Sequence, residues 1–280
     1  MFEAPTEEAK LEWLEMSLLF EGIYRHYGVD FRAYAPAILL RRLRRRLELE
    51  GLTTISSLQD RVFRDPQCLG RLVDDLTVNA TSMFRDPSFF LAFREQVVPV
   101  LRTYPFLRVW HAGCATGEEV YSLAILLAEE GLYERTRLYA TDVNESVLRR
   151  AREGIYPLTK MREYTVNYQQ SGGKRAFSDY YTARYDAALF DPQLARHVVF
   201  ARHNLVTDRS FSEFHVVFCR NVMIYFGRSL KERVIGLFHE SLVRGGLLAL
   251  GRRESLRFTS HEERFEPFVA LERVYRKVAL

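Results

Sequence analysis

The segment Val109-Trp110-His111-Ala112-Gly113-Cys114-Ala115-Thr116-Gly117-Glu118-Glu119 contains an apolar run, a turn with two glycines and the beginning of a helical pattern. Strand, glycine turn and helix in this order are typical of the nucleotide site of a doubly wound α/β domain. Gly113 and Gly117 allow the backbone to approach a ligand closely and to adopt dihedral angles that a Cβ disfavours. The segment therefore predicts an α/β domain with a ligand site at this turn.

The composition of the turn narrows the choice of ligand. The turn is not a clean GxGxxG, and it lacks the Gly-Lys-Ser/Thr ending of a phosphate-binding loop. Glu118 and Glu119 stand where such a loop places its phosphate-binding donors. They would repel a pyrophosphate and attract a cationic group. The turn therefore favours S-adenosylmethionine (SAM), whose methionine end carries an ammonium group, over NAD or ATP.

A second predicted strand, over residues 137–142, ends at Asp142. This carboxylate follows Gly117 by about one helix and one strand. In doubly wound nucleotide folds an acidic residue at this place accepts hydrogen bonds from the ribose hydroxyls. The alternative is that Asp142 only caps the helix that begins near Asn144.

The bulk composition is that of a globular protein. The chain has 280 residues, enough for one large and one small domain, and 48% of them are hydrophobic. No apolar run approaches the roughly 20 residues that span a bilayer. The N-terminus lacks the basic and apolar regions of a signal peptide. We therefore expect a soluble cytoplasmic protein, and the net charge of +4 does not by itself indicate nucleic acid.

The cysteines and histidines give no sign of a metal site. Cys68, Cys114 and Cys219 form no CxxC pair, and the histidines form no HExxH or similar cluster. Cys114 and Cys219 follow apolar runs, so we expect them to be small buried side chains rather than a functional disulfide.

Residues 1–78 predict a small domain of about four helices. Leucines recur at helical spacing in two groups, Leu11, Leu14, Leu18, Leu19 and Leu39, Leu43, Leu47. The second predicted helix carries five arginines on the arc opposite its leucines: Arg41, Arg42, Arg44, Arg45 and Arg46. They form either a solvated face or a docking surface for an acidic partner, which could be a protein surface, RNA or phospholipid.

Residues 79–280 alternate between strand-like and helical patterns. Apolar runs occur at 107–110, 138–140, 198–201, 216–219 and 247–251, and helical stretches at 118–130, 144–153 and 228–242. This alternation predicts a mostly parallel sheet, so the fold class is a doubly wound α/β sheet preceded by an all-helical domain. Residues 155–197 interrupt the alternation and predict a small, partly β insertion. Two short runs near the C-terminus could add edge strands.

Three further blocks supply polar residues near the same site. Asn79, Thr81 and Arg85 lie where the two domains join, and Asn204-Leu205 and Asn221-Val222 follow predicted strands. In an open α/β sheet, ligands bind at the carboxyl ends of the strands. Four strand ends thus present Gly113–Glu119, Asp142, Asn204 and Asn221 to one crevice.

These blocks, taken in order, resemble the chemotaxis receptor methyltransferases of the CheR family. The family pattern Asn-x-Thr-x-Phe-Phe-Arg-Asp corresponds to residues 79–86, with Met83 in place of an aromatic residue. Further blocks correspond to residues 110–122, 140–142, 218–226 and the Glu254-Ser255 region. His111 replaces a frequent serine and Val120 a frequent proline. The resemblance covers nearly the whole chain, including the arginine-rich helix.

The resemblance implies a cofactor site and a reaction. SAM would donate a methyl group to a glutamate side chain of a receptor, leaving S-adenosylhomocysteine (SAH). Asn79, Thr81 and Arg85 would line the SAM site, Glu118 or Glu119 would hold the methionine end, and Asp142 the ribose. The pairs Asn204-Leu205 and Asn221-Val222 would flank the adenine or nearby backbone.

The residues are compatible with this chemistry. A glutamate is ionised at neutral pH and needs no general base to attack a methyl sulfonium. Arg85 could orient the carboxylate of the substrate or that of SAM. Tyr225 could place a hydroxyl near the transferred methyl group, or it could be a packed aromatic residue.

We therefore expect a protein-glutamate O-methyltransferase that acts on chemoreceptors or chemoreceptor-like sensory proteins. The arginine-rich helix would dock on the receptor's cytoplasmic helical bundle, with membrane contact only through the receptor, and the enzyme would be a monomer. The 155–197 insertion could recognise a receptor peptide tail. One alternative is an RNA methyltransferase, but the chain lacks an Asn/Asp-Pro-Pro-Tyr motif and is not strongly basic. Another is a catalytically silent module that senses SAM or scaffolds a complex.

Overall fold

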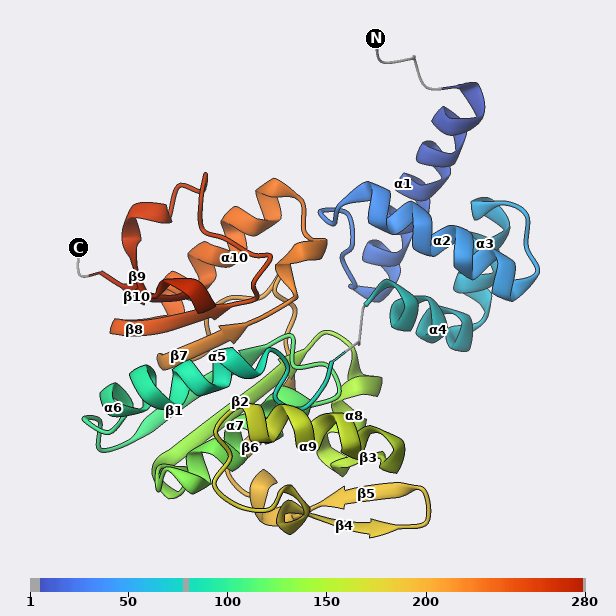
Figure 1. Ribbon diagram of the computed structural model, residues 1–280. Coiled ribbons are helices and arrows are strands. Elements are labelled where there is room, and N and C mark those ends of the chain that lie inside the picture. Colours follow the sequence, from blue (N-terminus) through green and yellow to red (C-terminus); the bar gives the residue numbers. More distant parts are fainter. Residues whose placement is uncertain (1–5, 78–80, 279–280) are drawn as a thin grey trace. The chain divides into compact units, whose positions relative to one another are not determined.

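The computed structural model describes residues 6–77 and 81–278, and these residues form two compact units (Figure 1). The first unit contains the described residues up to Thr77 together with Tyr225–Lys231. The second unit contains the remaining described residues. In the part of the chain that the structure describes, no helix is both long and apolar enough to cross a membrane.

The helical unit is built from four helices, which are α1 (Glu7–Tyr27), α2 (Pro36–Glu50), α3 (Ile55–Arg64) and α4 (Pro66–Leu76). Each begins or ends at a residue suited to that place. The Thr54 hydroxyl accepts a hydrogen bond of 3.1 Å from Ser57 N at the start of α3, and Gly51 ends α2 in the left-handed region. Leu43, Leu58 and Leu72 are fully buried in the core of this unit.

Helix α1 buries only one of its two apolar faces. Its core side chains are Met16, Leu19, Phe20 and Ile23, which follow the helical spacing. Of the four leucines whose spacing predicted this helix, only Leu19 is buried; the others, Leu11, Leu14 and Leu18, are more than half exposed. The helix has apolar residues on two sides, and contact with α3 determines which side is covered.

The larger unit contains a seven-stranded sheet with the order β6-β2-β1-β7-β8-β10-β9. Its strands are β1 (Leu107–Ala112), β2 (Thr136–Asp142), β6 (Val198–Arg202), β7 (Phe214–Cys219), β8 (Leu242–Leu250), β9 (Phe265–Val269) and β10 (Val274–Lys277). The first five in spatial order pair in parallel, whereas β10 is antiparallel to both β8 and β9. The predicted mostly parallel sheet is confirmed, and the two C-terminal strands extend it on the side of β8, with β9 at the edge.

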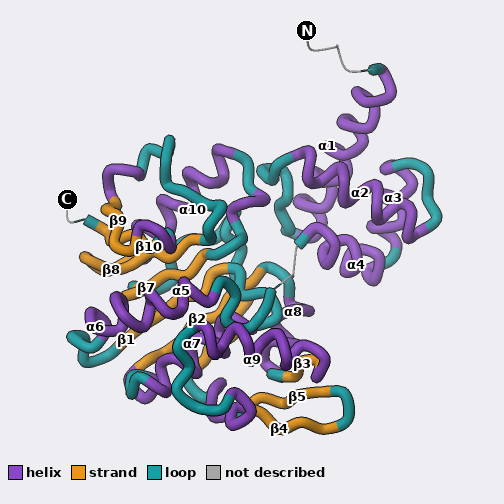
Figure 2. The backbone as a smooth tube through the Cα atoms, in the orientation of Figure 1, coloured by secondary structure: helices purple, strands orange, loops and turns teal. Residues whose placement is uncertain are grey.

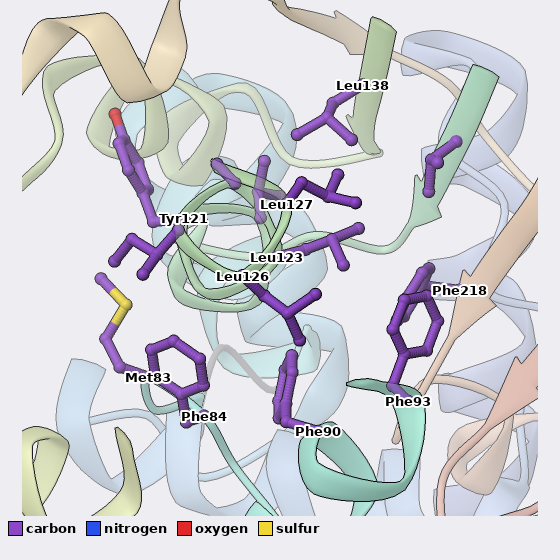
Figure 3. Close-up of a cluster of buried hydrophobic side chains, with 14 of the residues drawn as sticks. Met83, Phe84, Phe90, Phe93, Tyr121, Leu123, Leu126, Leu127, Leu138 and Phe218 are labelled. Carbon is purple, nitrogen blue, oxygen red and sulfur yellow. The ribbon is translucent and has the colours of Figure 1, made fainter. Parts of the chain in front are cut away.

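Helices cover both faces of this sheet. They are α5 (Pro87–Ala92), α6 (Val98–Leu101), α7 (Glu118–Glu129), α8 (Glu145–Glu153) and α10 (Arg228–Ser241). Because side chains alternate along a strand, Phe218 of β7 packs against Phe93, which follows α5, while Trp110 of β1 packs against Phe238 of α10. Figure 3 shows the first of these cores, in which leucines of α7 lie beside Phe90 and Phe93.

The insertion between α8 and β6 forms a second, smaller sheet, as Figure 2 shows. It contains β3 (Ile155–Pro157), α9 (Met161–Gln170), β4 (Tyr181–Arg184) and β5 (Ala187–Phe190), with the antiparallel strand order β3-β5-β4. The predicted partly β insertion is confirmed. Glu129 of α7 attaches the insertion to the rest of the unit, because its carboxylate accepts hydrogen bonds from the hydroxyls of Tyr168 and Tyr180.

Candidate cofactor site

The register of the parallel strands brings the predicted site residues to one edge of the sheet. Ala112 at the end of β1 pairs with Thr141, and Asp142 at the end of β2 pairs with Arg202 of β6. Cys219 at the end of β7 pairs with Leu250 of β8. The turns that follow these strands therefore start at the same level, at the carboxyl edge where open α/β sheets bind ligands.

The glycine turn after β1 adopts the backbone conformations that its sequence predicts. Gly113 has φ +78° and Gly117 has φ +92°, and Ala115 between them also has a positive φ, of 49°. The N–H of Gly113 donates to the carbonyl of Thr141 at 2.8 Å. A Cβ on Gly113 would lie 2.6 Å from Cγ2 of Val222, so this valine packs directly on the turn.

Asp142 connects the end of β2 to the glycine turn. Its Oδ2 accepts a hydrogen bond of 3.0 Å from Ala115 N, and its Oδ1 accepts one of 3.0 Å from Asn144 N. Burial raises the pKa of Asp142, and the backbone N–H donors oppose that shift. The cap of α8 is Asn144, whose Oδ1 accepts a hydrogen bond from Ser146 N. Asp142 is therefore more than a helix cap, and each oxygen retains acceptor capacity for a ribose hydroxyl.

The two glutamates that begin α7 have different surroundings. Glu118 accepts a hydrogen bond of 2.6 Å from the Thr116 hydroxyl, and Tyr164 of the insertion lies 3.4 Å from its other oxygen. Burial raises the pKa of Glu118. Burial alone would also raise the pKa of Glu119, but His111 and Arg220 reverse the shift and lower it. Glu119 is therefore a partly buried anion that is paired within the protein.

Arg220, the residue after β7, is a member of this site that the sequence analysis did not assign. Its Nη1 donates to Glu119 at 2.9 Å and its Nη2 donates to Asp86 at 2.8 Å. The same Nη2 lies 3.2 Å from the carbonyl oxygen of Arg85. Its guanidinium also lies 3.9 Å from the ring centroid of Phe89. A charged residue directly after an apolar strand, beside Asn221, was the signal in the sequence.

The loop that carries Arg85 is held in an unusual backbone conformation. Phe84 and Asp86, on either side of Arg85, have φ values of +49° and +58°. Phe84 is fully buried, and its N–H donates to the Ser122 hydroxyl at 2.8 Å. Thr81 is half-buried in the same loop, whereas the predicted contact Asn79 lies outside the described residues.

The turns after β6 and β7 are stabilised by their own hydrogen bonds. Asn204 Oδ1 accepts from Val206 N at 2.9 Å, and Leu205 is buried beside it. Asn221 has φ +61°, and its N–H donates to Glu254 Oε2 at 2.9 Å. The same oxygen of Glu254 accepts from Gly251 N at 2.7 Å, so Glu254 ties the ends of β7 and β8 together.

Tyr225 belongs to the helical unit rather than to the sheet unit. Its carbonyl accepts a hydrogen bond of 2.9 Å from Ala35 N, and the Arg42 guanidinium lies 5.7 Å from its ring centroid. The neighbouring Phe226 packs on Tyr34. A role for the Tyr225 hydroxyl in catalysis stays a prediction.

The five arginines of α2 do not form a uniform solvated face. Arg44 makes two hydrogen bonds to Glu12, of 2.7 and 2.6 Å, and Arg42 donates to the carbonyl of Asp75. Arg46 is buried and donates to Asp75 and Glu50. Arg41 and Arg45 are exposed. Three of the predicted docking residues therefore stabilise the packing of α2, which leaves Arg41 and Arg45 as the better candidates for a partner.

The strand-end residues fit SAM. A Cβ on Gly113 would meet Val222 and one on Gly117 would meet Ala151, so only glycine fits this turn. The buried Asp142 carboxylate supplies hydrogen-bond acceptors beside the turn. Glu118 and Glu119 supply negative charge at the start of α7. A phosphate group would find carboxylates at this helix terminus instead of the donors that it needs.

Comparisons with known proteins agree with this fit. The CheR methyltransferase all-alpha domain matches residues 14–77, and the CheR methyltransferase SAM binding domain matches residues 79–272. The chain is 52% identical over 264 residues to Cher3 of Pseudomonas putida, covering 94% of this chain and 97% of that protein.

More distant relatives also match over most of their length. The chain is 29% identical to a chemotaxis protein methyltransferase of Listeria monocytogenes, covering 84% of this chain and 87% of the relative. It is 30% identical to the chemotaxis protein methyltransferase of Escherichia coli, covering 93% and 90% of the two chains. SAM is the cofactor of the matched domain, and the chain belongs to the CheR methyltransferase family.

Proposed function

We propose that the protein transfers a methyl group from SAM to glutamate side chains of chemoreceptors or chemoreceptor-like sensory proteins, and so adjusts signalling adaptation. Membership of the CheR family supports a SAM-dependent methyltransferase. The observation that carries the proposal is Asp142, which is hydrogen-bonded to the glycine turn at the carboxyl edge of the sheet. This contact supports a nucleoside site at the turn, and the neighbouring acids suit a cationic cofactor.

The protein's own groups hold and orient the reactants. When bound, SAM supplies an electrophilic methyl group on a sulfonium. Asp142 would accept hydrogen bonds from the ribose hydroxyls, and Glu118 or Glu119 would face the ammonium group. Arg85 would orient a carboxylate, that of the substrate or that of SAM. Holding the reactants in line can contribute roughly 7–11 kcal/mol to lowering the barrier.

The reaction needs no general base. The acceptor glutamate is already ionised at neutral pH. His111 is the histidine of the β1 strand, and it is buried, stacked on Phe218 and placed 3.2 Å from Glu119. These contacts give His111 a structural role rather than that of a base that exchanges protons with substrate.

The helical unit would supply the receptor contact. Arg41 and Arg45 are exposed on α2, while the arginines between and after them support the packing of this unit. An exposed basic surface suits the acidic helical bundle that presents methylation sites in such receptors. Arg41 and Arg45 therefore form the proposed docking surface.

The test is methyl transfer from SAM labelled in its methyl group to purified cytoplasmic fragments of chemoreceptors. We expect label on receptor glutamates that is released by mild alkali, as an ester requires, and no label on a receptor with glutamine at those positions. The Asp142→Ala variant should bind SAH more weakly and transfer correspondingly less. SAH binding by the wild type without transfer to any receptor would refute the proposal and favour a silent SAM-sensing module, whereas label in RNA would favour an RNA methyltransferase.

A further inference from the structure

Arg220 joins three parts of the sheet unit that lie far apart in the sequence. It follows β7, its Nη1 bonds Glu119 at the start of α7, and its Nη2 bonds Asp86 at the start of α5. Its own side chain is only 2% exposed. Two carboxylates, a backbone carbonyl and an aromatic ring thus surround one buried guanidinium. A planar group with five N–H donors can make all of these contacts at once, which an ammonium cannot.

Arg220 bonds two of the candidate ligand contacts of the site, Glu119 and Arg85. Glu119 is one of the two carboxylates assigned to the methionine end of SAM, and the carbonyl contact fixes the backbone of Arg85. The Asp86 carboxylate makes no capping hydrogen bond to α5, although it stands at the N-cap position. Arg220 instead binds this carboxylate and thereby restrains the loop that contains Arg85.

The backbone of this loop is strained and therefore depends on stabilising contacts. The φ values of +49° at Phe84 and +58° at Asp86 are uncommon for residues with a Cβ, and each destabilises the loop. Such conformations persist only where surrounding contacts determine them. Burial and the Ser122 hydrogen bond hold Phe84, and Arg220 holds Asp86. Arg85 lies between the two fixed points.

We propose that Arg220 is a positioning residue for SAM binding, which orients Glu119 and the Arg85 loop through its bridge from Glu119 to Asp86. The inference rests on the site residues given under the proposed function and adds a residue to them. Without the bridge, Glu119 loses its neutralising cation and Asp86 loses the contact that stabilises its left-handed conformation. Both changes alter groups that face the cofactor while leaving the sheet in place.

The same unit contains a matched control, Arg94. Its side chain is 6% exposed, close to the value for Arg220, and it also bonds two carboxylates and a backbone carbonyl, those of Glu129, Glu130 and Ser171. Its partners fix the insertion to α7 and are not candidate ligand contacts. Arg94→Gln therefore removes a buried arginine of equal chemistry that shares no carboxylate partner with the proposed bridge.

The test is calorimetric titration of SAH into the wild type, Arg220→Gln, Asp86→Asn, the double variant and Arg94→Gln, well below their unfolding temperatures. Removing one partner of a buried charge pair predicts that Arg220→Gln weakens SAH binding by about tenfold or more. Asp86→Asn should weaken it less, and the double variant should bind no more weakly than Arg220→Gln, because both changes break one bridge. Arg94→Gln should lower the unfolding temperature and leave SAH affinity within about twofold, since it lies outside the bridge.

Wild-type SAH affinity in folded Arg220→Gln would overturn the inference, as would strictly additive losses in the double variant. If Arg220→Gln does not fold, Asp86→Asn serves as the test, because Asp86 lies near the surface and asparagine has nearly the same shape. Unchanged SAH affinity in Asp86→Asn would also overturn the inference. The titrations need no receptor. Failure of methyl transfer by the wild type would therefore refute the proposed function without bearing on Arg220.

Discussion

The contact between the glycine turn and Val222 can be tested with the substitution Gly113→Ala. Two separate effects should destabilise this variant. Gly113 has φ +78°, a conformation that costs a residue with a Cβ roughly 1–2 kcal/mol. The added Cβ would also lie 2.6 Å from Cγ2 of Val222, and overpacking of this kind costs typically about 1–3 kcal/mol. The free energy of unfolding should therefore fall by roughly 2–5 kcal/mol.

Gly131, at the end of α7, separates the two effects. It has φ +68°, and a Cβ there would meet no atom within 4 Å. Gly131→Ala should therefore carry the backbone cost alone, about 1–2 kcal/mol. For a unit of this size 1 kcal/mol corresponds to about 2–4 °C in Tm, so the steric effect should separate the two variants by roughly 2–12 °C.

The assay combines thermal unfolding with SAH titration. Gly113→Ala should lower Tm more than Gly131→Ala does and should weaken SAH binding, because the turn must shift to accommodate the methyl group. Val222→Ala in the Gly113→Ala background should restore part of the loss, since it removes the clashing methyl groups. Equal Tm shifts for the two alanine variants, or no recovery with Val222→Ala, would show that Val222 does not pack on the turn.

Two further predictions concern charge. Replacing Arg41 and Arg45 with Glu should abolish receptor methylation and leave SAH affinity unchanged. The control Arg64→Glu, on the same unit, should retain both methylation and SAH affinity. Undiminished methylation by the Arg41 and Arg45 variant would contradict the docking surface. Burial alone would raise the pKa of Glu129, but hydrogen bonds from Tyr168 and Tyr180 and the charge of Arg94 lower it. Ionised Glu129 thus contributes its full stabilisation above the pKa that it has in the unfolded chain. This contribution is lost as the pH falls through its lower pKa in the folded protein. When the pH falls from about 5 to 3, the free energy of unfolding measured with urea should decrease less for Glu129→Gln than for the wild type. An equal decrease in both proteins would refute the lowered pKa of Glu129.

The sheet could be predicted from the sequence because its central strands are buried on both faces. Such strands are continuous apolar runs, as at Val109–Ala112 and Val216–Cys219, and the helices between them imply parallel pairing. The order of the small sheet could not be predicted. Its strand β3 has three residues, too few for a pattern, and it pairs with β5 about thirty residues later.

The buried face of α1 could not be predicted for a related reason. Leu11, Leu14 and Leu18 have the spacing of a buried stripe, yet they are exposed. The face with Met16, Leu19 and Ile23 has the same spacing. Periodicity shows that a helix is amphipathic, but the choice between two apolar faces depends on where α3 packs, which is a tertiary contact.

Within the site, whether a residue's role can be predicted from the sequence depends on how far apart in the chain the interacting residues are. Gly113 and Asp142 occupy positions that the strand–turn–helix order defines, so they were predictable from local pattern. Arg220, Glu119 and Asp86 are joined by ion pairs between residues more than 30 positions apart. Nothing in the local pattern of any one of them indicates the other two, and only the fold brings them together.

This network also bears on how the site can accept an anionic substrate. In the proposed reaction, a glutamate carboxylate would approach a strand edge that already carries Glu118, Glu119 and Asp142. Arg220 neutralises Glu119, and backbone N–H groups donate to both oxygens of Asp142. Charge on these groups is thereby compensated before any substrate arrives, so its repulsion of an incoming carboxylate is reduced. An arginine that contacts neither reactant would then matter for both, because it keeps a carboxylate suited to the cofactor's ammonium from opposing the acceptor.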